Sequence, residues 1–174
     1  MKDWFASVCS RRSYRVTAGA LALSLVSATA AAALFVDVPG IPGSSTKAGF
    51  AGQIDATSLS MNVANVGGKP SLGSIVFTKQ IDAATPLLFE ASGSGRVLGS
   101  VIVQTTRSTD LGETVVTKYT FANARVASWR LTDPGSTVAS EQVTLLATSY
   151  TLELFGTDAR GRALPPVSRT VSGQ

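Results

Sequence analysis

The sequence predicts a mainly β protein: a compact closed β-barrel of antiparallel strands with one short α-helix packed on its side, preceded by a signal peptide. Apolar and polar residues alternate in several segments, as they do in half-buried strands. Glycine and proline, 16 and 7 of the 174 residues, gather between those segments and predict turns. About five or six strands around one helix would fit a small barrel in a single domain.

The first 30 residues differ in composition from the rest and predict an export signal. Residues 18–26 form an uncharged, mostly apolar run, and the small residues 28–30 follow it, as signal peptidase cleavage requires. We therefore expect a signal peptide over residues 1–30 and one domain over residues 31–174. The basic residues that begin the signal are Lys2, Arg11, Arg12 and Arg15.

Other readings of this N-terminal segment remain open. Residues 10–14 resemble the front of a twin-arginine signal. An uncleaved anchor over residues 16–36 could just span a bilayer. If translation starts near Leu34 instead, no leader exists and the protein is cytoplasmic before secretion. With the leader, we expect a secreted or periplasmic protein that has no stable membrane span after cleavage.

The charge balance and the missing histidine exclude several functions. Residues 1–30 hold four of the 15 basic and one of the 11 acidic residues, so 11 basic and 10 acidic residues remain, a net charge of +1. That balance predicts no nucleic-acid partner. Without histidine, and with Cys9 the lone cysteine, the chain can form neither a Ser-His-Asp triad nor a Cys/His zinc site. We expect no cofactor and no metal.

The first half of the domain predicts strands separated by turns. Residues 34–38 form a short apolar strand, which the proline and glycine of 39–43 end. Residues 44–52 are polar and glycine-rich, so we expect an exposed loop. Residues 54–66 alternate as a half-buried strand, and 75–77 form the centre of the next one. The apolar face of the alternating strand consists of Leu59, Met61 and Val63.

One short helix is predicted in the middle of the chain. Thr85 can act as its N-cap, with Pro86 at the first helical position. The glycines of 93–95 predict its end. Because so short a helix is unstable alone, it must dock on the sheet. The candidate anchors are Leu87, Leu88 and Phe89.

The second half again predicts strands. Residues 108–113 form a turn, and residues 115–131 form a long strand. The apolar parity along that strand changes between Phe121 and Val126, so we expect a bulge or bend near Asn123. The strand before this turn has one apolar face, made of Val97, Val101 and Val103.

The C-terminal part predicts one more turn and one more strand. Residues 133–135 form a strong turn, and residues 143–155 form the last long strand. The tail from Gly156 onward is interrupted by glycine and proline and predicts no further strand.

The order of four segments resembles the haemolysin-coregulated protein (Hcp) family, the tube subunits of type VI secretion systems. The segments are residues 34–52, 77–95, 119–128 and 141–150. The run from 77 to 86 is the most specific, because it fixes a strand end, a turn acid and a helix start together. The residues that match the family motifs are Phe77, Thr78, Lys79, Asp82, Thr85, Pro86, Glu141, Val143 and Leu145.

The resemblance implies a non-enzymatic protein that forms hexameric rings, which stack into a tube carrying effector proteins. Its partners would be itself, effectors and other type VI secretion proteins. The loop after the first strand takes part in stacking in the family, although this chain lacks the usual acidic residue there. The corresponding residues here are Ser44, Ser45, Thr46, Lys47, Gly49, Phe50 and Gly52.

Two other functions remain as alternatives. The leader favours an exported binding module with the Hcp fold that acts outside the cytoplasm without a tube. Ser44 and Lys47 also have the S-x-x-K spacing of serine acyl-enzymes. That chemistry needs the serine at a helix start, whereas this pair follows Pro42 and Gly43 in a predicted loop. The sequence therefore favours a protein without catalytic activity.

Overall fold

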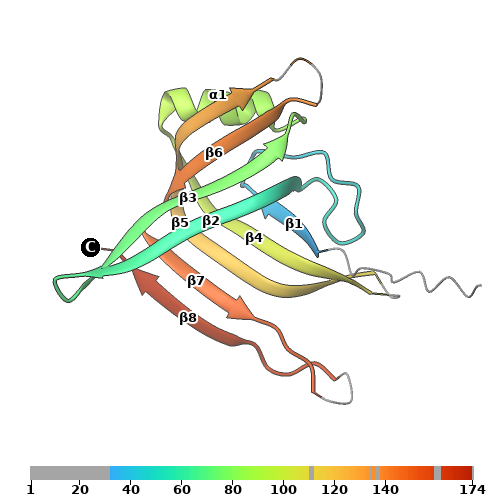
Figure 1. Cartoon of the computed structure of the whole chain (residues 1–174), viewed down its shortest axis with the longest axis vertical. Helices are drawn as coiled ribbons and strands as arrows, with labels where there is room; N and C mark the ends of the chain where they lie inside the picture. Colours follow the sequence, from blue (N-terminus) through green and yellow to red (C-terminus); the bar gives the residue numbers. More distant parts are fainter. Residues whose placement is uncertain (1–31, 110–111, 134, 136–137, 159–161, 174) are drawn as a thin grey trace, which may run out of the picture.

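The computed structural model describes residues 32–109, 112–133, 135, 138–158 and 162–173 (Figure 1). These residues form eight strands and one helix. In chain order they are β1 (Ala32–Asp37), β2 (Ile54–Val66), β3 (Lys69–Gln80), α1 (Thr85–Ser94), β4 (Val97–Thr109), β5 (Gly112–Thr132), β6 (Ser140–Leu146), β7 (Ser149–Leu154) and β8 (Val167–Ser172).

Six of the strands close into a ring. Their hydrogen-bonded order is β4-β1-β2-β3-β6-β5, and β4 also pairs with β5. Every pairing is antiparallel. Closure pairs both edges of each ring strand over part of its length, which limits the free edges at which sheets aggregate. The closed antiparallel architecture with one helix is confirmed.

β7 and β8 extend this ring on one side. β5 is long enough to pair with β6 near its end and with β7 near its middle, and β8 adds to the far edge of β7. In Figure 1, β7 and β8 project away from the end of the ring that carries α1. The β2–β3 hairpin also projects, and its turn has positive φ at both Gly67 and Gly68, as a two-residue hairpin turn requires.

One apolar core fills the ring, and α1 contributes to it. Phe77, Phe121 and Leu145 are fully buried among other strand residues. The helix adds Leu88 and Ala91, also fully buried. Such burial is the main stabilising term of a small domain. Of the three expected helix anchors, Leu88 is buried, Leu87 is partly buried and Phe89 is 60% exposed.

The start of α1 differs from the prediction. Ala84, not Thr85, is the N-cap, and no side chain caps the first turn in the usual way. The Thr85 hydroxyl instead accepts a hydrogen bond from the backbone N–H of Asp82 at 3.1 Å. Pro86 is therefore at the second helical position, one later than predicted. Gly95 ends the helix with φ of 63°, as expected.

The predicted irregularity in the long strand β5 is confirmed. Asn123 has φ of 50° and is the one non-glycine residue with positive φ among those described. Phe121 pairs with Val101 and Ala124 pairs with Gly99, so the register shifts across Asn123. Asparagine tolerates this left-handed conformation better than most residues.

Three details of the strands differ from the sequence-based prediction. The expected single strand over 143–155 is divided into β6 and β7 at Ala147 and Thr148. The tail contains β8, which was not expected. Val97 is 62% exposed, although Val101 and Val103 are buried, because the register shift at Gly99 separates Val97 from them.

The expected signal peptide over residues 1–30 lies outside the described residues. Among the residues that are described, no helix has the length and apolar character needed to cross a membrane.

Candidate functional site

The loop of residues 43–53, between β1 and β2, is closed by its own backbone. The Gly43 N–H donates to the Gly52 carbonyl at 2.8 Å, and the Gly52 N–H donates to the Ser45 carbonyl at 2.9 Å. The Ser45 N–H donates to the Gln53 carbonyl at 3.0 Å. A Cβ atom at Gly43 would lie 2.3 Å from the Gln53 carbonyl oxygen, so only glycine fits there.

The predicted exposed loop is exposed only in part. Phe50 is buried and stacks on Phe35, with ring centroids 4.2 Å apart and planes 12° from parallel. Ser45 is also buried. The remaining predicted stacking residues are exposed: Ser44, Thr46, Lys47, Gly49 and Gly52. The loop therefore presents a polar surface over an aromatic anchor.

Ser44 connects this loop to another part of the molecule. Its hydroxyl oxygen accepts a hydrogen bond from the Ala83 N–H at 3.1 Å, in the turn between β3 and α1. Ser44 and Lys47 lie in the loop and not at a helix start, so the arrangement lacks the placement that serine acyl-enzyme chemistry needs.

The family-motif residues of β3 and β6 lie opposite one another. Phe77 pairs with Val143, and Lys79 pairs with Glu141. Leu145 continues the series beside Ile75. Two motifs more than 50 residues apart in the sequence therefore form one continuous, buried face of the ring.

At the end of this face, Lys79 is the centre of a buried polar cluster. Its side chain is 0% exposed. The Lys79 ammonium lies 2.7 Å from Asp82 Oδ1 and 3.1 Å from Glu141 Oε2. It also donates to the Gln80 carbonyl at 2.8 Å and to the Thr85 hydroxyl at 3.3 Å. This number of acceptors satisfies a charged ammonium away from water.

Trp129 completes the cluster from β5. Its indole N–H donates to Glu141 Oε2 at 3.3 Å, and Phe89 of α1 covers the indole edge-on at 5.2 Å. Glu141 Oε1 is buried and has no hydrogen-bond partner among the described residues. The pairing of a buried acid with this indole could not be predicted from the sequence, because the two residues are 12 positions apart on different strands.

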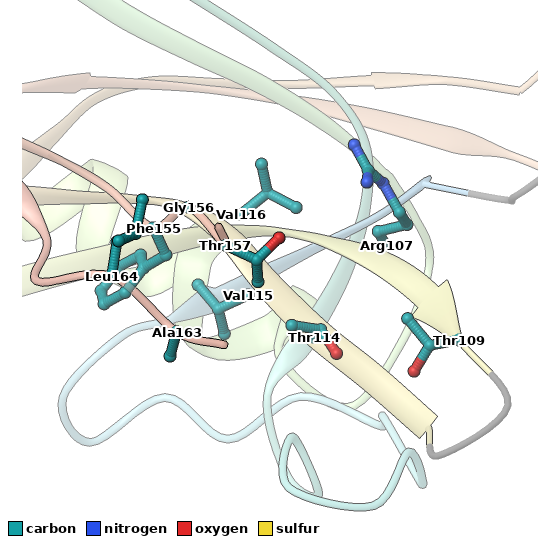
Figure 2. A pocket seen from close by; sticks show the side chains of 10 residues that line it. All are labelled: Arg107, Thr109, Thr114, Val115, Val116, Phe155, Gly156, Thr157, Ala163 and Leu164. Carbon is teal, nitrogen blue, oxygen red and sulfur yellow. The ribbon is translucent and has the colours of Figure 1, made fainter. Parts of the chain in front are cut away.

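A surface groove lies away from this cluster, between the β4–β5 hairpin and the segment after β7 (Figure 2). Its volume is about 800 Å³. Its apolar lining comprises Val115, Val116, Phe155, Ala163 and Leu164. Its polar lining comprises Arg107, Thr109, Thr114 and Thr157. Nearby apolar side chains of β7 and β8 are also exposed, namely Leu152, Leu154 and Val167.

Neither the cluster nor the groove gathers metal-binding side chains. In the part of the chain that the structure describes, no group of three or more Cys, Asp or Glu residues could hold a metal ion.

The fold and the site together define a class: a small closed β protein with one helix, whose polar side chains join strands, turn and loop. The family model described as "Type VI secretion system effector, Hcp" matches residues 35–153. The chain therefore belongs to the Hcp family of type VI secretion proteins.

Solved structures from three bacteria have the same fold. The crystal structure of Hcp1 from Salmonella typhimurium is 22% identical, with a TM-score of 0.71 over 82% of this chain and 94% of that one. A type VI secretion system effector from Yersinia pestis is 18% identical, with a TM-score of 0.68 over 80% and 98%. The secreted protein Hcp3 from Pseudomonas aeruginosa is 17% identical, with a TM-score of 0.65 over 83% and 99%. No curated protein matches the sequence.

Proposed function

We propose that this chain is the ring-forming subunit of a type VI secretion tube, in which hexameric rings stack and carry effector proteins. The proposal rests chiefly on the family match over residues 35–153. The predicted motif residues that lie on β3 and β6 pair with or face one another, which is consistent with it. The role is structural and needs no cofactor. A closed ring of paired strands suits it, because such a body is rigid and has few free edges.

Self-association requires complementary surfaces, and the chain exposes a candidate. The groove beside β7 and its surroundings expose several large apolar side chains, Leu154 and Leu164 among them at 48% and 49%. Clustered apolar surface of this kind marks interaction sites. A ring closes when two different patches on each copy meet at a suitable rotation. We assign the groove to one of these patches.

The loop of residues 44–52 is the proposed contact between stacked rings. Its tip is polar and exposed, and its base is fixed by Phe50 on Phe35. The net charge of +1 for residues 31–174 supports stacking, because weakly charged faces of identical rings repel little.

Light scattering on residues 31–174 tests the proposal directly. At high micromolar concentration we expect a species six times the subunit mass, and rings in electron micrographs. A protein that stays monomeric under these conditions would contradict the tube function.

A second candidate function is an exported module with the Hcp fold that acts outside the cytoplasm without a tube. The basic and apolar leader over residues 1–30 favours it. The two functions differ in their route out of the cell. Export of the full chain would stop without a functioning secretion sheath if it is a tube subunit, and would continue if it is an independently exported module.

The first residue of the native protein distinguishes a cleaved signal peptide from a translation start downstream of it. Mass spectrometry should find a chain that begins near residue 31 if the signal is cleaved. A start near Leu34 by translation, which precursor labelling distinguishes from cleavage, would favour a cytoplasmic subunit.

A further inference from the structure

We propose that the ion pair of Lys79 and Asp82 is a positioning device for the loop of residues 43–53. The pair fixes the turn of residues 81–84, and one hydrogen bond from that turn holds the loop beside the ring. The inference concerns the placement of the loop within a single subunit. Only its consequence for ring stacking rests on the proposed function.

The turn between β3 and α1 is held by backbone hydrogen bonds and by side chains. The Thr85 N–H donates to the Asp82 carbonyl at 3.2 Å and the Ile81 N–H to the Ala139 carbonyl at 3.4 Å, while the N–H groups between them have side-chain acceptors. The N–H of Asp82 donates to the Thr85 hydroxyl at 3.1 Å, and the N–H of Ala84 donates to Asp82 Oδ1 at 2.9 Å. Between them, the Ala83 N–H donates to Ser44 of the loop at 3.1 Å. Three consecutive N–H groups thus each have a side-chain acceptor, and one of these comes from the loop.

Lys79 joins this turn to the rigid part of the molecule. It is fully buried on β3 and is held by Glu141 of β6, so its ammonium has a fixed position in the ring. Asp82 Oδ1 forms an ion pair with the Lys79 ammonium and accepts a hydrogen bond from the Ala84 N–H. The direction of the Ala83 N–H, which lies between these contacts, is therefore set by the buried ammonium.

The hydrogen bond from the Ala83 N–H to Ser44 holds the first half of the loop in place. The other half is fixed independently, because Phe50 is stacked on Phe35. Loss of the contact between Ser44 and Ala83 should therefore loosen one side of the loop and leave its aromatic base in place.

Hydrogen exchange on the chain tests this placement, at a concentration where light scattering gives one species for all variants. The loop amides of Gly43, Ser45 and Gly52 are hydrogen-bonded and report on the loop. We expect Ser44→Ala to speed their exchange about two- to tenfold, the effect of one lost hydrogen bond. Amides of the β4–β5 hairpin, which makes no backbone hydrogen bond to the loop among the described residues, should not change. Thr46→Ala, at another exposed position of the same loop, is the matched control.

Asp82 variants test the connection to Lys79 without leaving a buried charge unpaired, because the Lys79 ammonium keeps Glu141 as its partner and Asp82 itself is partly exposed. Asp82→Ala should speed exchange of the same loop amides. Asp82→Asn keeps an acceptor for the Ala84 N–H but loses the charge that pairs with Lys79, so it should speed their exchange nearly as much. In a double-mutant cycle, Ser44→Ala and Asp82→Ala should together have little more effect than either alone, because both break the same path.

Two results would overturn the inference. One is additive effects of Ser44→Ala and Asp82→Ala on the loop amides. The other is an equal acceleration by Asp82→Ala in the β4–β5 hairpin, which would indicate a general loss of stability. Both readouts concern the single subunit, so a protein that forms no rings would contradict the proposed function and leave this result unaffected. If rings do form, Asp82→Ala should give more single rings and fewer stacked columns than the wild type.

Discussion

At the scale of single residues, the molecule contains a buried charge that an apolar core would normally exclude. Lys79 and Glu141 are both 0% exposed and face each other across β3 and β6. Burying two charges costs several kcal/mol of desolvation each, roughly offset by their attraction and their hydrogen bonds. Such a pair adds little net stability, but it makes the removal of either partner costly.

Lys79→Met should therefore destabilise the protein strongly. The Glu141 carboxylate would be left with the Trp129 N–H alone, and we expect a loss of about 3–5 kcal/mol in the free energy of unfolding. Adding Glu141→Gln removes the unpaired charge and keeps an acceptor for the indole, so the double variant should recover at least half of that loss. Urea unfolding measures both. A double variant no more stable than Lys79→Met would contradict this account.

Tyr150 should make the free energy of unfolding depend on pH in the alkaline range. Its hydroxyl donates to the Gly73 carbonyl, and burial raises the pKa of this phenol above its usual value near 10.0. Below pH 10 the phenol is protonated in both states, so its contribution to stability is fully present. As the pH rises from about 10 through the folded-state pKa, only the unfolded state ionises, and stability falls.

Urea unfolding between pH 8 and pH 11 tests this assignment. The wild-type free energy of unfolding should decrease above pH 10. Tyr150→Phe should lose about 1 kcal/mol at pH 8 from the missing hydrogen bond and should show a shallower decrease. Equal slopes for the two proteins would show that Tyr150 does not carry the effect.

At the scale of elements, local sequence patterns predicted those features that depend on neighbouring residues, such as strand bounds and strand irregularities. The alternation in residues 54–66 predicted β2 with the bounds that the structure has. The parity change predicted the irregularity near Asn123, because the apolar face of a strand switches sides where one strand carries an extra residue. The motif residues Lys79 and Glu141 were identified as well, although only as family markers.

What the sequence did not reveal depends on contacts between distant segments. β8 has mostly exposed residues, and it is a strand because β7 offers it an edge, not because of its own pattern. Ser44 and Ala83 are 39 residues apart, and nothing local to either indicates their hydrogen bond. The N-cap is Ala84 and not Thr85, because the Thr85 hydroxyl is engaged by the turn before the helix.

At the scale of the whole molecule, the apolar groove should decide association without affecting the fold. Leu164 lines this groove and is 49% exposed. Because it is a surface residue outside the core, Leu164→Glu should change the free energy of unfolding of the subunit by no more than about 0.5 kcal/mol. If copies associate through the groove, the buried carboxylate should weaken assembly at least about tenfold.

Sedimentation or light scattering across a concentration series measures this effect, with Val97→Glu as the matched control. Val97 is 62% exposed and lies outside the groove, and it pairs with Arg125, so its replacement adds a charge at a site with an adjacent cation. If Leu164→Glu associates as strongly as the wild type, the groove is not part of the interface. Equal weakening by the two variants would show that added charge, and not the groove, limits association. Weakening by Leu164→Glu alone, with an unchanged unfolding transition, would identify the groove as a surface through which one copy holds the next.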